Sequence, residues 1–164
     1  MEFNEEARVD LYNEVNGLSD EQLNKRPADD QWSIKQIMEH LFLMEGAITK
    51  TIIEKLEDGE EVNAELKPIE ASLNRTIKVQ APEFAIPNDD FATLEELKLK
   101  LTATHQGLIK VSETADEKQL ESKGFPHPVF GQMSLKQWIP FIAYHEKRHT
   151  LQIVEVKEKL GISN

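Results

Sequence analysis

The chain has 164 residues, the length of one ordinary domain, and 39% of its residues are apolar while 30% are charged. Its 19 basic and 30 acidic residues give a net charge of −11, which argues against nucleic acid or an anionic membrane as the main partner. Because the chain contains no cysteine, disulfides and thiolate ligands are excluded, and any metal must be held by His, Asp or Glu.

The sequence also shows no sign of a membrane or export segment. Its apolar runs are short and interrupted by charges, and its first six residues include three glutamates where a secretory signal would be basic. We therefore expect one cytoplasmic domain spanning residues 1–164.

The first half of the chain carries three helical patterns, judged from the spacing of apolar residues. In chain order they are a helix over residues 4–16, a short helix from Ser19 that ends before Pro27, and a long helix from Ser33 to about Asp58. The last two begin with a capping box, in which a hydroxyl and a Gln three residues later cap each other's backbone N–H groups.

A long irregular connection follows, over residues 60–91. It contains Pro68, Pro82 and Pro87, and residues 76–79 are the stretch in it that could be extended. A connection of this length can run the length of a helical bundle, so the helices on either side of it need not be antiparallel neighbours.

Two further long helices complete the pattern, one from Thr93 to about Thr114 and one from Ser134 to Gly161, each opening with a capping box. Between them, residues 121–132 carry two glycines and two prolines, which indicates a turn-rich loop. The predicted fold class is therefore all-α: a four-helix bundle with a long crossover between its second and third long helices.

Three histidines fall on the apolar faces of these helices. His145 and His149 are four residues apart, so both project from one face about one turn apart, and His40 points toward the interior from another helix. Neutral imidazoles suit transition metals, and three ligands leave a coordination position open for chemistry. The pattern predicts a divalent metal site, with Zn²⁺ or Ni²⁺ favoured and Fe²⁺ or Mn²⁺ as alternatives.

The other two histidines leave choices open. His105 also lies on an apolar face, so it could be a fourth ligand or, more commonly, a core histidine bonded to a backbone carbonyl. His127 lies in the Pro-Gly loop and is expected at a loop or at the rim of a pocket. A bundle whose core histidines bind no metal at all is the remaining alternative.

Two charged residues beside the histidine pair are candidate catalytic groups. Glu146 lies within the apolar stripe, where it could orient a ligating imidazole or carry a proton, or else reach solvent at the edge of the stripe. Arg148 points away from the ligand face, so it could anchor a substrate carboxylate at the rim or be a surface charge.

Two segments resemble the DinB-like, or YfiT-like, superfamily of metal-dependent enzymes. The first is similar to that family's Trp-Ser-Ile…His-Leu helix opening, and the order and spacing of motifs match across nearly the whole chain. The segments are Trp32 to Leu41, and His127-Pro128-Val129-Phe130-Gly131 followed by Ser134-Leu135, Trp138 and residues 145–153.

The resemblance implies a four-helix bundle with a long crossover and a metal site formed by His40, His145 and His149, without His105. Known relatives include transferases that use low-molecular-weight thiols such as bacillithiol or mycothiol, and an isomerase. We therefore expect a metal-dependent enzyme that transfers such a thiol, as co-substrate, to an electrophilic small molecule. The alternatives are a metal-dependent hydrolase and a non-catalytic bundle that binds a metal or a small molecule; a homodimer is a further expectation.

Overall fold

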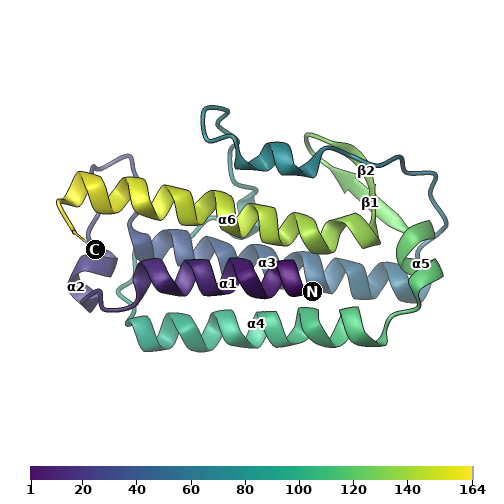
Figure 1. Ribbon diagram of the computed structural model, residues 1–164, viewed down its shortest axis with the longest axis horizontal. Coiled ribbons are helices and arrows are strands. Elements are labelled where there is room, and N and C mark those ends of the chain that lie inside the picture. Colours follow the sequence, from purple (N-terminus) through teal and green to yellow (C-terminus); the bar gives the residue numbers. More distant parts are fainter. Residues whose placement is uncertain (164) are drawn as a thin grey trace.

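Four long helices form the body of the protein in the computed structural model, which describes residues 1–163 (Figure 1). They are α1 (Glu2–Val15), α3 (Ile34–Asp58), α4 (Leu94–Thr114) and α6 (Leu135–Leu160). The shorter elements are α2 (Asp20–Asn24), α5 (Glu117–Ser122), the 3₁₀ turns η1 (Ile69–Leu73) and η2 (Glu83–Ala85), and strands β1 (Gly124–His127) and β2 (Gly131–Ser134). The predicted all-α four-helix bundle is confirmed, with a small hairpin added.

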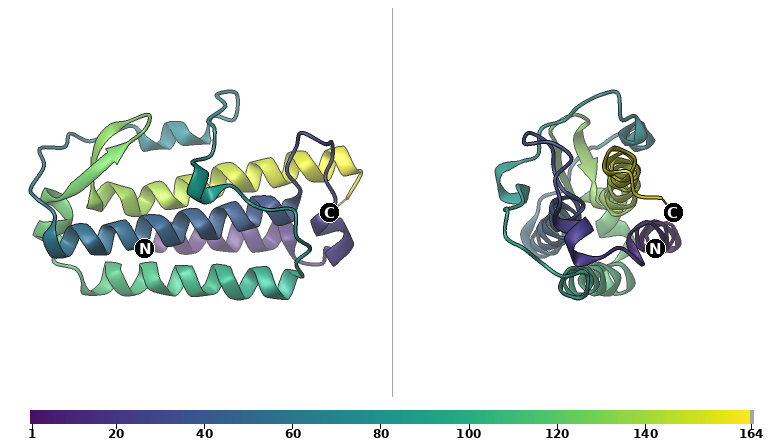
Figure 2. Two further views of the ribbon diagram at one scale, coloured as in Figure 1. Left: turned by 180° about the vertical axis from the view of Figure 1, so that it is seen from behind. Right: turned by 90° about the vertical axis from the view of Figure 1, so that its left-hand side faces the viewer.

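The crossover between α3 and α4 determines the direction of the helices. It returns the chain to the end of the bundle where α3 began, so α3 and α4 run in the same direction and pack against each other (Figure 1). The first and last helices, α1 and α6, form a second parallel pair, as the views from behind and from the end also show (Figure 2). None of the helices within residues 1–163 is both long enough and apolar enough to cross a membrane.

The helix starts follow the sequence signals closely. Complete capping boxes are present at Ser19, Ser33 and Thr93. At the start of α6, Ser134 accepts a bond from the backbone N–H of Gln137, but the Gln137 side chain does not bond back to it. That side chain instead pairs with the backbone N–H and C=O of Lys67, at 2.9 and 3.0 Å. Gln137, which was expected to complete the capping box of α6, therefore ties the crossover to this helix instead.

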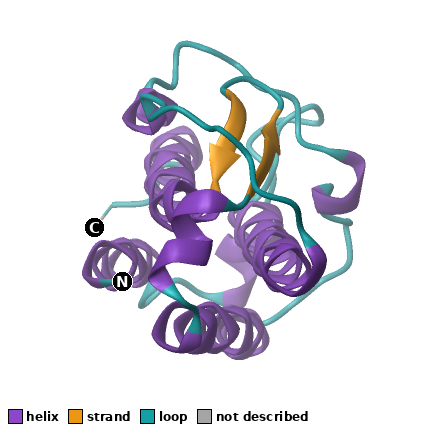
Figure 3. Cartoon of the chain, turned by 90° about the vertical axis from the view of Figure 1, so that its right-hand side faces the viewer, coloured by secondary structure: helices purple, strands orange, loops and turns teal. Residues whose placement is uncertain are grey.

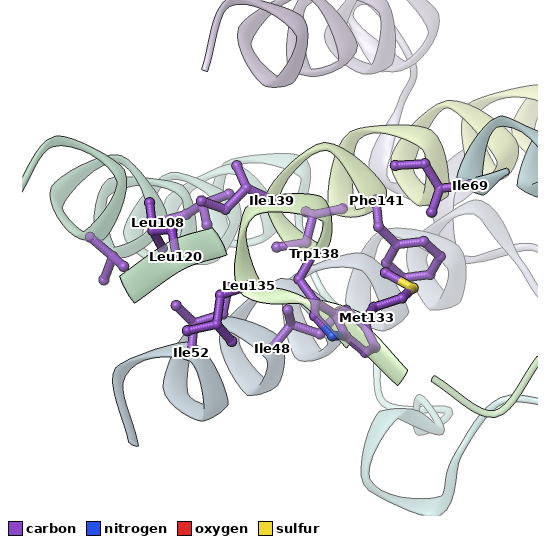
Figure 4. Close-up of a cluster of buried hydrophobic side chains, with 12 residues drawn as sticks. Ile48, Ile52, Ile69, Leu108, Leu120, Met133, Leu135, Trp138, Ile139 and Phe141 are labelled. Carbon is purple, nitrogen blue, oxygen red and sulfur yellow. The ribbon is translucent and has the colours of Figure 1, made fainter. Parts of the chain in front are cut away.

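The apolar core consists of two clusters separated by a polar layer. One cluster lies at the hairpin end of the bundle, where Ile48 and Ile52 of α3 meet Leu108 of α4 and Trp138 of α6 (Figure 4). The other lies at the opposite end and includes Leu11, Val15, Leu23, Ile37, Leu101 and Ile153. Each helix contributes apolar residues at helical spacing to these clusters, which is what drives the bundle together.

The segment between α4 and α6 differs from the predicted turn-rich loop. It forms α5 and then an antiparallel hairpin in which Phe125 pairs with Met133, on the side of the bundle formed by α3 and α6 (Figure 3). An isolated two-stranded hairpin is marginal, but here the Phe125 ring stacks on Trp138 at 4.2 Å, and the Trp138 indole N–H donates to the Phe125 carbonyl. Packing on α6 therefore stabilises two strands in a segment whose glycines and prolines had indicated a loop.

The stretch over residues 76–79, which could have been extended, forms no strand. Turn and irregular backbone occupy this part of the crossover, and no strand is assigned to those residues. Asn74 explains the turn, because its side-chain oxygen accepts from both the backbone N–H and the hydroxyl of Thr76. Such a local bond favours a turn over an extended strand.

Candidate metal centre

Three imidazoles converge between α3 and α6. His145 and His149 project from successive turns of α6, and His40 meets them from α3. The Nε2 atom of His145 lies 3.1 Å from Nε2 of His40 and 3.2 Å from Nε2 of His149. One ligand atom from each of the three histidines lies within 4.8 Å of the others, so the structure brings together the three residues expected to bind a metal.

Hydrogen bonds fix which nitrogen of two imidazoles faces the centre of the cluster. Nδ1 of His40 lies 2.7 Å from the backbone carbonyl of Ala85, and Nδ1 of His149 lies 2.7 Å from the side-chain oxygen of Gln152. These oxygens can only accept, so each Nδ1 carries the hydrogen and each Nε2 presents a lone pair to the cluster. Metal-ligating histidines in proteins are commonly held by such outer bonds.

The electrostatics of the cluster fit a cation. Burial lowers the pKa of His149 to about 3, and burial likewise lowers the pKa values of His40 and His145, so the three imidazoles are neutral at pH 7. The lone pairs on Nε2 of His40 and Nε2 of His149 both face Nε2 of His145, and a single hydrogen there cannot bond to both equally well. Two nitrogens bound tetrahedrally to zinc lie roughly 3.4 Å apart, close to the separations found here.

A cavity of about 1220 Å³ opens onto the three histidines between α3, α6, the crossover and the hairpin. Its walls are largely apolar and aromatic, with Trp32, Phe84, Phe125, Phe130, Trp138 and Phe141 among the lining residues. Five basic and three acidic residues also line it, so its formal charge is +2 although the chain carries −11. They are Lys50, Arg75, Lys78, Arg148 and Lys159, with Asp30, Glu54 and Glu155.

His127 lies on the wall of this cavity, in agreement with its expected place at a pocket rim. It ends β1, and its ring packs against Phe130, Trp138 and Phe141 with centroids 4.7–5.4 Å apart. Burial lowers the pKa of His127 to about 4, so this imidazole is also neutral at pH 7. It is not one of the three histidines whose nitrogens converge.

Glu146 does not line the cavity. It lies in a buried group of four ionisable residues that we call the ion-pair layer: Arg8, Glu45, His105 and Glu146. The Arg8 guanidinium donates to Glu146 at 2.9 Å and to Glu45 at 3.2 Å. Burial raises the pKa of Glu146 to about 7, although Arg8 acts in the opposite direction. Glu146 is not at a solvent-exposed edge, and its contact with Arg8 supports a structural role.

His105 belongs to the same layer and not to the histidine cluster. Its Nδ1 lies 2.9 Å from the Glu45 carboxylate, so its partner is a side chain and not the backbone carbonyl that we expected. Burial acts to lower the pKa of His105, but the hydrogen bond and the charge of Glu45 raise it above its ordinary value. Arg8 also donates to the Leu101 carbonyl, so this layer connects all four long helices.

Arg148 holds the crossover against α6. Its side chain is buried, which excludes the surface position, and it donates to the backbone carbonyls of Ser72, Asn74 and Ile77 at 2.6–2.9 Å. Although Arg148 lines the cavity, its two terminal nitrogens therefore already serve these three carbonyls. This placement favours a role in shaping the cavity wall.

Sequence reasoning missed Arg8, Glu45 and the carbonyl of Ala85. Two of them left a signal: Arg8 is three residues from Leu11, and Glu45 is four from Leu41, so both charges lie within apolar stripes. A charged residue in such a stripe predicts a buried partner. The contact from Ala85 to His40 spans 45 residues and depends on the path of the crossover, which no local pattern encodes.

Two known proteins are similar to this chain in sequence over most of its length. YuaE of Bacillus subtilis (strain 168), an uncharacterized protein, is 36% identical over 160 residues, covering 98% of both chains. GK0616 of Geobacillus kaustophilus (strain HTA426), provisionally named a metal-dependent hydrolase, is 28% identical over 154 residues, covering 93% of this chain and 79% of its own.

Solved structures show the same fold. YfiT from Bacillus subtilis, described as "a probable metal-dependent hydrolase with an unusual four-helix bundle topology", superposes with a TM-score of 0.67 at 18% identity, covering 99% of this chain and 86% of that one. The four-helix bundle protein TT2238 gives a TM-score of 0.63 at 18% identity, covering 94% of each chain. The sequence profile of the DinB superfamily matches residues 4–153. The chain therefore belongs to the DinB superfamily.

Proposed function

We propose that this protein is a metal-dependent enzyme in which His40, His145 and His149 hold a divalent cation, Zn²⁺ or Ni²⁺ in first place and Fe²⁺ or Mn²⁺ as alternatives. We further propose that it transfers a low-molecular-weight thiol to an electrophilic small molecule. The observation that carries the proposal is the convergence of three neutral imidazole Nε2 atoms at a large cavity. A divalent cation bound there would lower the pKa of a coordinated nucleophile.

The charge of the chain's own ligands supports this chemistry. Three neutral imidazoles do not offset the charge of a divalent cation, whereas a carboxylate ligand would offset part of it. The basic residues of the cavity add to this local positive field, and Lys50 and Lys78 form no salt bridge within residues 1–163. An anionic nucleophile or substrate would be attracted into the cavity for both reasons.

The size of the cavity supports transfer between two organic molecules. Its volume of about 1220 Å³ exceeds the roughly 300–1,000 Å³ that is usual for one small ligand. In the proposed reaction the thiol loses its proton to solvent, its sulfur forms a bond to the electrophilic carbon, and the leaving group departs with the electron pair. Hydrolysis is the second candidate, supported by the descriptions of GK0616 and YfiT, and needs room for one organic substrate only.

Metal analysis and a thiol-consumption assay test the proposal together. The full chain, purified without an affinity tag, is loaded with Zn²⁺ or Ni²⁺ and mixed with 1-chloro-2,4-dinitrobenzene and either bacillithiol or cysteine. We expect one metal ion per chain, and release of chloride with formation of the thioether at a rate that depends on the metal.

The matched controls are histidine variants of the same chain. His149→Ala removes one of the converging nitrogens and should abolish both metal uptake and thioether formation, whereas folded His105→Ala should retain the metal. Thiol-independent cleavage of an ester or amide panel by the loaded protein would instead support the hydrolase. Failure to take up any of the four metals in stoichiometric amount would refute both.

A further inference from the structure

The hairpin carries a histidine whose hydrogen-bonding state is set by its own turn. His127 pairs with Gly131 at the end of the hairpin, and its side chain folds back over the residues between them. Its Nδ1 accepts hydrogen bonds from the backbone N–H groups of Val129 at 3.0 Å and Phe130 at 3.2 Å. A ring nitrogen that accepts must carry a lone pair, so the hydrogen of this neutral imidazole resides on Nε2.

The Nε2–H group of His127 faces away from that turn. The two ring nitrogens of an imidazole point in widely different directions, and Nδ1 is directed at the turn backbone. Within residues 1–163, Nε2 of His127 has no hydrogen-bond partner. Since it is not one of the buried atoms without a partner, this nitrogen is accessible from outside the protein's packed interior. Because His127 lines the cavity, this donor is available to a molecule inside it.

The surroundings indicate what kind of molecule would accept this bond. The His127 ring packs against Phe130, Trp138 and Phe141, and all four side chains belong to residues that line the cavity. His40 and His149 present lone pairs at the same cavity, whereas His127 offers a hydrogen. An apolar or aromatic molecule with an acceptor oxygen, such as a carbonyl, matches both the rings and the donor.

We propose that His127 binds the substrate directly, donating its Nε2–H to an acceptor oxygen of an aromatic or apolar electrophile. That the bound molecule is the substrate rests on the proposed function, but the donor and its aromatic surroundings do not depend on the metal. A donor fixed before binding loses no freedom when the ligand arrives. His127 is then a substrate-binding residue, and the hairpin turn determines its tautomer.

The tautomer is tested by long-range ¹H–¹⁵N NMR of the ¹⁵N-labelled full chain at pH 7.5, with and without Zn²⁺. The resonances of His127 are assigned by their loss in His127→Asn. We expect the nitrogen signature of a protonated Nε2 and an unprotonated Nδ1. A hydrogen on Nδ1 would overturn the inference, and this result can be read whether or not the chain binds metal.

Ligand binding is tested with two probes that differ by one acceptor, acetophenone and ethylbenzene, titrated against the full chain with Zn²⁺ present. In His127→Asn the amide oxygen can still accept from the turn, but no donor reaches the ε position. In His127→Gln an amide N–H can occupy that position. If His127 only stabilises the turn, Asn is the better replacement; if it binds the ligand, Gln is.

We expect the acetophenone affinity to fall about 3- to 10-fold in His127→Asn and to recover in His127→Gln, with ethylbenzene affinity unchanged in both. Acetophenone that does not bind the native chain, or binds equally to the native chain and His127→Asn, would overturn the inference. If the tautomer and the probe affinities behave as expected while no metal binds, the donor is established and the proposed function alone has failed.

Discussion

The ion-pair layer provides a test in which the expected loss of stability can be worked out from the structure. The Glu45 carboxylate is 3% exposed and accepts from Arg8 at 3.2 Å, Thr104 at 2.6 Å and His105 at 2.9 Å. Glu45→Gln keeps the shape but removes the charge, and its amide nitrogen must face one of these donors. Breaking a buried ion pair from one side costs about 3–5 kcal/mol, and because one oxygen remains we expect about 3 kcal/mol.

Glu155→Gln is the matched control. Glu155 also pairs with an arginine, Arg75, at 2.7 Å, but its side chain is 42% exposed, so its loss should cost less than about 1 kcal/mol. The free energy of unfolding of both variants is measured by urea titration at pH 7, following the fluorescence of Trp32 and Trp138. A loss below about 1 kcal/mol for Glu45→Gln, or one equal to the control, would refute the reasoning.

The remaining predictions concern pH, the crossover and the hairpin. His105 and Arg8 hold the pKa of Glu45 below 4.5 despite its burial, so its carboxylate stabilises the fold above that pH. The difference in unfolding free energy between the native protein and Glu45→Gln should therefore shrink as pH falls through the lowered pKa, and a constant difference from pH 7 to 3 would contradict this. Glu45 raises the pKa of His105, so protonated His105 stabilises the fold fully below pH 6.5. In urea titrations, the advantage of the native protein over His105→Asn should be lost as pH rises through the raised pKa. Arg148→Gln should expose the crossover to trypsin at Arg75 and Lys78, seen as faster cleavage by mass spectrometry, whereas unchanged cleavage would show that the three carbonyl bonds do not hold it. Gly124→Ala would place a Cβ 2.1 Å from the Met133 carbonyl oxygen and should unpair the hairpin, detected as loss of amide-exchange protection in β1 and β2.

The long helices could be predicted because each is encoded locally. The helix predicted from Ser33 to about Asp58 is α3 (Ile34–Asp58), and the one predicted from Thr93 to Thr114 is α4 (Leu94–Thr114). Capping residues and apolar spacing determine such segments without reference to the rest of the chain. The hairpin was missed because the spacing of apolar residues does not reveal that Phe125 stacks on Trp138 of α6.

The histidine cluster was predictable for a similar reason, and its surroundings were not. The spacing of His145 and His149 places both on one helix face, and the stripe position of His40 directs it inward. Some of the groups that bond to these side chains come from distant segments, as the Ala85 carbonyl does for His40. Glu146 shows this well: its place in the stripe is visible in the sequence, but Arg8, which it contacts, lies 138 residues away.

The bond from His40 to the Ala85 carbonyl has a consequence for how this bundle could diversify. Two of the converging histidines lie on one rigid helix, whereas the third takes its tautomer and ring angle from a crossover backbone group. A shift of this backbone carbonyl would therefore change the direction and the basicity of the His40 Nε2 atom. Insertions or substitutions in the crossover can therefore alter the orientation and basicity of His40 while all three histidines stay unchanged.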